Sequence, residues 1–166
     1  MTNDARLVAI HRNPAPKEVP MPDPTYDTDF YAWTQGQAAA LRAKDLTALD
    51  LEHLAEEIDS LGNEQRHAVR SHLRVLLWHL LKWAYQPTHR TTSWRTSIRN
   101  ARAEITDRLD DYPSLRPHVP ALLTAAYRQA RGLAADETDL PLATFPEACP
   151  WPLADVLTED WLPPEA

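Results

Sequence analysis

The residues best suited to chemistry lie between Lys82 and Arg102, on either side of the turn expected at Gln86-Pro87. They combine cationic side chains, which can bind an anion, with an aromatic ring and polar groups. These residues are Lys82, Gln86, Arg90, Ser93, Trp94, Arg95, Arg99 and Arg102. Guanidinium groups bind phosphate and carboxylate in a bidentate manner, and the start of a helix offers unpaired backbone N–H groups. We call these residues the basic corner, a candidate binding site for a small anion in a sensor or an enzyme.

The charge pattern around this corner supports a structural alternative. Residues 66–102 contain eight Lys/Arg and no Asp or Glu, whereas the rest of the chain has nine Lys/Arg against 24 Asp/Glu. The acidic helix that precedes this run could neutralise it, with Glu56, Glu57 and Glu64 as the ion-pair partners. This alternative predicts that most of the arginines in the run lie within ion-pair reach of a carboxylate.

Several classes of function receive no support from the residues. The three glycines, Gly36, Gly62 and Gly132, are too far apart for a phosphate-binding glycine loop. The net charge of −7 and a pI of about 5.4 disfavour nucleic acid, because flanking acidic helices repel a phosphate backbone. Glu64-x-x-His67 is a single copy of a motif that di-metal sites need twice, so we expect no metal and no cofactor. No catalytic residue can be assigned.

Composition indicates a single all-α domain. The 166 residues are 43% hydrophobic, and scarce alternation of β-branched residues argues against a sheet. The one cysteine, Cys149, cannot form an intrachain disulfide, and no apolar run approaches the roughly 18 residues of a membrane span. Without a visible targeting signal, we expect a cytoplasmic protein with no membrane partner.

Prolines and apolar spacing divide the chain. Five prolines predict a flexible tail over residues 1–24, followed by a single helical-bundle domain over 25–166. A first helix follows an N-cap at Asp27. A long second helix begins after Asp50 and carries Leu51, Leu54, Ile58 and Leu61 on one face, with a kink rather than a break at Gly62. The predicted architecture is thus a bundle of four main helices with a long kinked second helix and a short C-terminal helix.

Further signals place the later helices. Gln86-Pro87 ends the second helix, Ser93 caps the third, and Tyr112-Pro113 stops it. Ser114 caps the fourth helix, which Pro120 should bend or delay. The last helix is short, from Pro152 to about Thr158.

Four strings of residues carry a family resemblance: YDTDFYAW, LDLEHLAEEIDSLGNEQR, HLLKWAYQPTHRTTSWRTSIRNAR and TFPEACPW. From about Tyr26 to Pro163 the chain resembles the DUF29 family of small bacterial helical proteins. The resemblance implies an all-helical fold and no assigned function, and it transfers no catalytic residue. His53 stands where the family's N-L-A-E-E string has Asn.

These observations favour a non-enzymatic helical module that binds a protein partner or self-associates. Trp78 lies opposite the Leu73/Leu76/Leu80 stripe of its helix, so either this helix is buried all round or Trp78 is offered to a partner. The alternative function is a small-anion sensor or enzyme at the basic corner. A nucleic-acid-associated protein is the second alternative.

Overall fold

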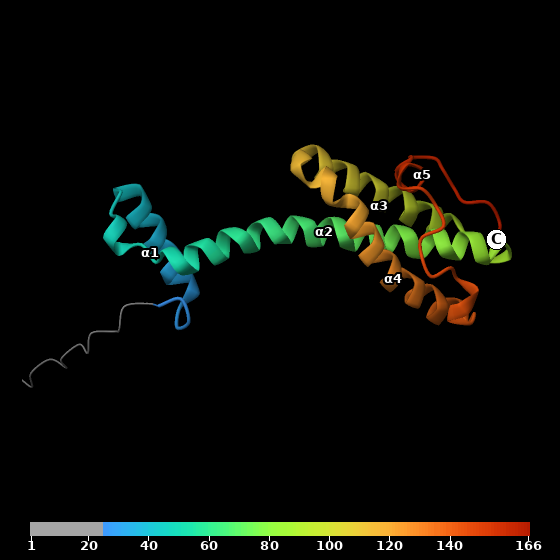
Figure 1. The fold of residues 1–166 in the computed structure, drawn as a ribbon, viewed down its shortest axis with the longest axis horizontal. Helices are drawn as coiled ribbons and strands as arrows, with labels where there is room; N and C mark the ends of the chain where they lie inside the picture. Colours follow the sequence, from blue (N-terminus) through green and yellow to red (C-terminus); the bar gives the residue numbers. More distant parts are fainter. Residues whose placement is uncertain (1–24) are drawn as a thin grey trace, which may run out of the picture. The chain divides into compact units, whose positions relative to one another are not determined.

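A computed structural model describes residues 25–166, so the predicted tail over residues 1–24 lies outside the described part. The described chain is all-α, as predicted, with four substantial helices and a short fifth one near the C-terminus (Figure 1). The helices are α1 (Phe30–Ala43), α2 (Leu51–Tyr85), α3 (Thr92–Asp111), α4 (Val119–Thr138) and α5 (Leu153–Leu157). Short 3₁₀ segments cover Leu46–Ala48 (η1), Pro87–His89 (η2), Pro113–His118 (η3) and Leu142–Thr144 (η4).

Helix α2 is the longest element, with 35 residues, and it continues through Gly62 without a break. Asp50 precedes its first residue and accepts a hydrogen bond from the backbone N–H of His53 at 3.3 Å, as an N-cap should. One glycine inside a helix costs only about 1 kcal/mol relative to alanine. The long second helix of the prediction is therefore confirmed.

Three predicted caps are wrong, each for a local reason. Asp29, not Asp27, caps α1, because its carboxylate accepts from the N–H of Ala32 at 2.9 Å. Thr91, not Ser93, caps α3 and accepts from the N–H of Trp94, which places Ser93 inside the first turn. Ser114 falls in η3, and α4 begins only at Val119 because the prolines at 117 and 120 lack the N–H groups that a helix interior needs.

Contacts divide the chain into two compact units, whose boundary in the sequence falls between His53 and Leu54. The single domain predicted over 25–166 stays a prediction. In the first unit, Trp33 of α1 is buried and makes edge-to-face contacts with Tyr26 and His53. No helix among residues 25–166 has the length and apolar character that crossing a membrane requires.

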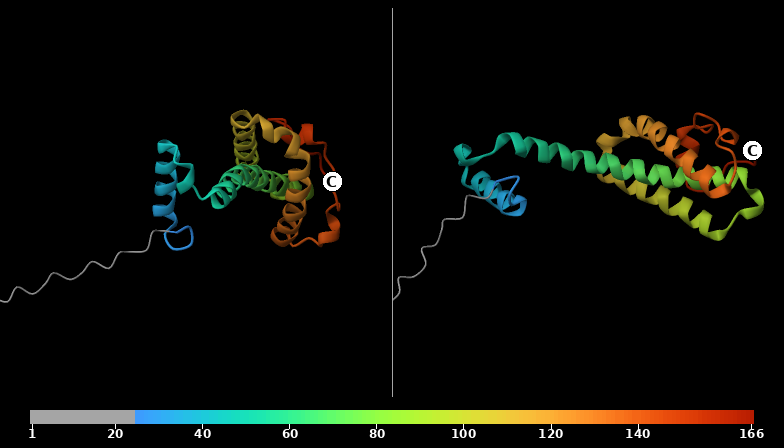
Figure 2. Two further views of the ribbon diagram at one scale, coloured as in Figure 1. Left: turned by 60° about the vertical axis from the view of Figure 1, so that its left-hand side comes forward. Right: turned by 90° about the horizontal axis from the view of Figure 1, so that it is seen from below.

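The core of the second unit forms around the C-terminal half of α2. Figures 1 and 2 show α3 and α4 beside this part of α2, with the segment after α4 folded back along them. Both helices contribute apolar residues at helical spacing, such as Ile98 and Ile105 from α3 and Ala126 and Ala130 from α4. From His79 to Ala84 every residue of α2 is buried. The turn that follows, which holds the basic corner, therefore starts from a rigid helix end.

Candidate functional site: a basic corner and an exposed apolar face

Lys82 of the basic corner is part of the interior. Its side chain is 2% exposed and its ammonium donates to Oε1 of Glu137 on α4 at 2.6 Å. The same nitrogen lies 4.3 Å from the ring centre of Trp94 and 5.0 Å from that of Trp78. A carboxylate and two aromatic faces thus surround the charge on three sides, which joins α2, α3 and α4. Lys82 is therefore already engaged and does not serve the candidate anion site.

Arg102 is also part of the interior. It is 3% exposed, and burial lowers the pKa of its guanidinium. Its three nitrogens donate to the carbonyl oxygens of Val156, Glu159 and Trp161 at 2.6–2.8 Å. One side chain of α3 thereby holds the backbone of α5 and of the segment that follows it. This arrangement satisfies three carbonyls and commits each nitrogen of the guanidinium to the fold.

Arg90 and Arg95 both lie close to the ring of Trp83. The guanidinium carbons are 5.0 Å and 5.4 Å from the ring centre. Arg90 Nε donates to the Trp83 carbonyl at 2.9 Å, Nη1 donates to Glu165 at 3.1 Å, and the buried Nη2 has no hydrogen-bond partner. Both arginines line a cavity of about 370 Å³ together with Trp83, Thr91 and Thr92. Because Thr91 caps α3, the first N–H groups of that helix lie at this cavity.

The remaining residues predicted for the basic corner make contacts outside the cavity of Arg90 and Arg95. Gln86 donates from Nε2 to the carbonyl of Thr138 at 3.1 Å, and the ring of Trp94 is under Lys82. Arg99 is exposed and lines a second cavity of about 320 Å³ with Arg95, whose wall also contains Glu159 and Asp160. The structure therefore brings Arg90 and Arg95 together at the first cavity and Arg95, Arg99 and Arg102 together at the second.

The predicted internal neutralisation of the basic run does not hold for the described residues. Their ion pairs engage Lys82 with Glu137 and Arg90 with Glu165, and none of the following is within 4.0 Å of a carboxylate: Arg66, Arg70, Arg74, Arg95, Arg99 and Arg102. Arg102 uses carbonyls, and Arg70 contacts Nδ1 of His67 at 3.0 Å.

The register of α2 against α3 explains why the expected partners do not meet. Arg108 of α3 donates to Gln65 of α2 at 2.6 Å, so Glu64 lies opposite the C-terminal end of α3. Arg102 lies six residues earlier on α3, about 9 Å away along the helix axis. Glu56 and Glu57 are further still, two turns before Glu64 on the rigid α2. Adjacency in sequence therefore gave the wrong partners.

Sequence reasoning identified the face of Leu54, Ile58 and Leu61 but not its exposure. Ile58 is 66% exposed and Leu61 is 63% exposed, although they repeat at the spacing that usually marks a core face. Beside them is a hollow of about 610 Å³, whose wall includes Tyr112, at the end of α3, and Leu115 of η3. We call Leu54, Ile58 and Leu61 the apolar face. The signal available in the sequence was the absence of a second apolar repeat long enough to cover both halves of α2.

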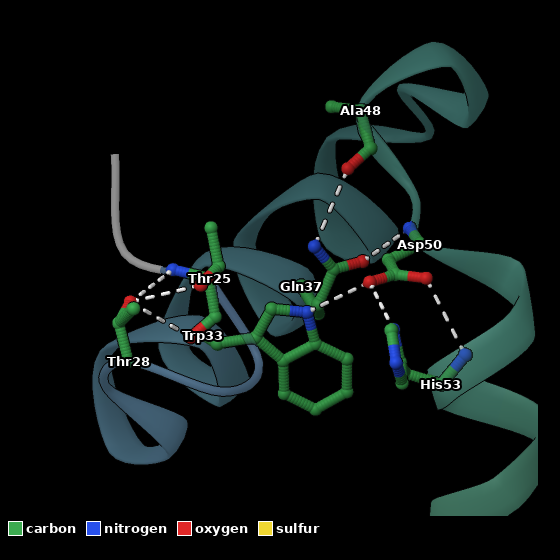
Figure 3. Close-up of polar contacts among 7 residues, drawn as sticks. All are labelled: Thr25, Thr28, Trp33, Gln37, Ala48, Asp50 and His53. Atoms are coloured by element: carbon green, nitrogen blue, oxygen red, sulfur yellow. Dashed lines mark hydrogen bonds and ion pairs between the residues drawn. The ribbon is translucent and has the colours of Figure 1, made fainter. Parts of the chain in front are cut away.

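A polar network in the first unit fixes the start of α2 (Figure 3). Asp50 accepts from Trp33 Nε1 at 3.3 Å, and its Oδ2 is 2.7 Å from Nδ1 of His53. Gln37 of α1 accepts from the N–H of Asp50 at 2.8 Å and donates to the carbonyl of Ala48 at 3.4 Å. The hydrogen bond from His53 is the main cause that lowers the pKa of Asp50. These hydrogen bonds join α1 to the N-cap of α2, so their role is structural.

A family model described as "Domain of unknown function DUF29" matches residues 25–162. No curated protein and no solved structure matches the chain. The match covers nearly all of the described residues, including the basic corner and the apolar face.

Proposed function

Since the chain belongs to the DUF29 family, a family of unknown function, we propose from its own surface that it is a helical protein-interaction module, and that the apolar face of α2 is its binding surface. The observation that carries the proposal is the exposure of Ile58 and Leu61, at 66% and 63%. An apolar stripe on a rigid helix, beside a hollow, is typical of a surface that a partner covers.

The way α2 is built supports this function. The same helix buries Leu73, Leu76 and Leu80 completely, so the part that carries the apolar face is anchored by a packed core. A surface on a regular element keeps its side chains in fixed positions, which reduces the entropy lost on binding. The hollow adds Tyr112 and Leu115, which a partner's side chain can contact.

The test is selection of helical peptides from a displayed library on the immobilised full chain, followed by measured affinities. Selected peptides should bind the wild type and lose about 100-fold in affinity for an Ile58→Asp, Leu61→Asp double variant, since two apolar anchors are removed. Leu46→Asp with Leu142→Asp is the matched control, because these leucines are 73% and 48% exposed outside the apolar face. Peptides that bind all three proteins equally, or no recovered peptide, would contradict the proposal.

A second candidate function is the binding of a small anion at the cavity of Arg90 and Arg95. The specific observation is that both arginines lie close to the Trp83 ring where α3 begins, and line the same cavity of about 370 Å³. Helix N–H groups and guanidinium groups both attract phosphate or carboxylate.

This candidate is tested by thermal unfolding with and without tens of millimolar inorganic phosphate, at an ionic strength matched with chloride. A bound anion raises the midpoint by mass action in the wild type and not in an Arg90→Ala, Arg95→Ala double variant. Arg99→Ala is the control, because Arg99 does not line this cavity. Equal shifts in all three proteins would exclude the anion site.

A further inference from the structure

We infer that the cavity between α4 and the segment that follows it is a binding site for a free α-amino acid with an apolar side chain. The cavity measures about 290 Å³, and its wall includes Arg128 of α4 and Glu147 and Trp151 of the later segment. None of these residues belongs to the apolar face or to the basic corner, so the site is separate from both proposed functions. Three properties of the cavity point to this ligand: fixed walls, an apolar part and two opposite charges.

Hydrogen bonds hold the two walls of the cavity together. The hydroxyl of Tyr127 on α4 donates to the carbonyl of Pro146 at 2.9 Å. One turn later, Arg131 donates to two carbonyl oxygens of the same segment, both at 3.0 Å. Arg128 and Glu147 each follow directly after one partner of the first contact, so their backbones are held in place. A site whose walls are already in place loses less entropy when a ligand binds.

Part of the cavity wall is apolar. Leu123 and Tyr127 of α4 belong to the core and are 8% and 2% exposed. Cys149 and Trp151 pack against the same core and are half-buried. An aliphatic or aromatic side chain of a ligand can pack against these groups, as in most sites for small molecules.

The polar part of the wall carries one cation and one anion. Arg128 and Glu147 line the same cavity, yet the ion pairs found among residues 25–166 engage neither of them. Both residues are exposed, so a ligand can reach them. A guanidinium group binds a carboxylate through two parallel hydrogen bonds, and a carboxylate accepts hydrogen bonds from an ammonium group. These two residues therefore complement a molecule that carries both groups.

An α-amino acid carries a carboxylate and an ammonium group on one carbon atom, together with a side chain. At about 290 Å³, the cavity is smaller than most sites for drug-sized molecules, so it suits a single amino acid rather than a peptide. A simple anion would meet the like charge of Glu147, and a simple cation would meet that of Arg128. Like charges discriminate against both, whereas the zwitterion satisfies both residues.

The experiment titrates four probes into the full-length chain by calorimetry. L-Leucine has both charges and an apolar side chain, glycine lacks the side chain, 4-methylpentanoate lacks the ammonium group and 3-methylbutylamine lacks the carboxylate. L-Leucine should bind about tenfold more tightly than each of the others, because each of them loses one of the three contacts. Equal affinities for all four probes, or no binding of L-leucine, would overturn the inference.

Two substitutions test which residue binds which charge. Arg128→Gln should lower the affinity for L-leucine towards that for 3-methylbutylamine, and Glu147→Gln should lower it towards that for 4-methylpentanoate. Arg99→Gln and Glu56→Gln are the controls, because they make the same charge changes at exposed residues outside the cavity. Equal losses in the controls and in the cavity variants would mean that only the net charge matters, which would overturn the site.

The thiol of Cys149 shows where the ligand binds. Cys149 is the only cysteine of the chain and it lines the cavity, so alkylation by iodoacetamide measures access to this wall. The reaction is followed at mildly alkaline pH, since burial raises the pKa of the thiol. Saturating L-leucine should slow alkylation several-fold, and 4-methylpentanoate at the same concentration should not. L-Leucine that binds without changing this rate would lie elsewhere, and the inference would be overturned.

Discussion

Leu61 and Leu80 lie on the same helix, in apolar repeats of similar spacing, yet Leu61 is 63% exposed and Leu80 is fully buried. The two leucines differ in which elements of the same chain pack against them. Around Leu80, α3 and α4 contribute apolar rows to the core, whereas Leu61 borders a hollow that Tyr112 and Leu115 also line. Helical spacing shows which residues share a face, and only the rest of the fold decides whether that face is covered.

The charges of the two halves differ in the same way. In the buried half, Lys82 and Arg102 are enclosed by specific acceptors: a carboxylate and two rings for the lysine, and three carbonyls for the arginine. In the exposed half, the acidic residues remain at the border of a solvent-exposed apolar row. Enclosed charges need specific acceptors inside the fold, whereas charges at an exposed surface are largely solvated.

Truncating each of the two leucines tests most directly whether one is covered and the other is not. We expect Leu80→Ala to lower the free energy of unfolding by about 3–5 kcal/mol, because a fully buried side chain leaves a cavity. Leu61→Ala should change it by less than about 0.5 kcal/mol, as is usual for surface positions. Urea unfolding followed by circular dichroism measures both values. A large loss in Leu61→Ala would show that the apolar face is covered within the molecule.

Much of this architecture could be predicted from sequence. Prolines at 87 and 113 fixed the ends of α2 and α3, since the residue before a proline avoids the helical region. Apolar spacing gave the long second helix and its two faces. The sequence leaves two places for Trp78, and in the structure it is half-buried against the core, with its Nε1 buried and its ring beside Lys82.

The roles of the charged residues could not be predicted. Lys82 and Glu137 are 55 residues apart, and Arg102 and Val156 are 54 apart. The segment after α4 has no regular apolar spacing, so its sequence does not indicate which of its carbonyl oxygens will be buried and need a hydrogen-bond donor. Ion-pair partners chosen by adjacency failed because the α2–α3 register, not sequence distance, determines which side chains meet.

Removing the Arg102 guanidinium should have the next largest effect. Arg102→Met keeps the apolar stem but leaves three carbonyls without their donor, so we expect a loss of about 2–4 kcal/mol. Arg99→Met is the control, because Arg99 is exposed on the same helix, and it should change stability by less than about 0.5 kcal/mol. Chemical unfolding gives the free energy of unfolding of both variants. Equal losses would mean that the hydrogen bonds to the three carbonyls contribute nothing measurable to stability.

The packed region should also respond to alkali. Burial raises the pKa of Tyr127 to about 12, and its hydroxyl donates to the carbonyl of Pro146 at 2.9 Å. The unfolded chain ionises this phenol near pH 10, so the native state keeps its full stability below that pH and loses about 2 kcal/mol as the pH rises to 12. Unfolding free energies measured across this window should show the loss in the wild type and not in Tyr127→Phe. Tyr112→Phe, at an exposed tyrosine, should preserve it; a Tyr127→Phe profile that matches the wild type would contradict the assignment.

The smallest expected effect comes from replacing a helical glycine by alanine, which tests whether the exposed half of α2 unfolds together with the rest of the molecule. Gly62 and Gly132 both lie inside helices, and a Cβ atom on either meets nothing within 4 Å. Alanine at such a position stabilises the helix by about 0.5–1 kcal/mol, chiefly through the entropy of the unfolded chain.

Gly132 belongs to α4, which packs on the core, so Gly132→Ala should raise the global free energy of unfolding by that full amount. Gly62 belongs to a segment with few tertiary contacts, which opens locally at a lower cost than the core. Gly62→Ala should therefore slow amide hydrogen exchange over residues 54–64 while the global unfolding midpoint changes less than in Gly132→Ala. Equal gains in the global midpoint would mean that the helix unfolds as one cooperative unit. The apolar face would then be held as rigidly as the core.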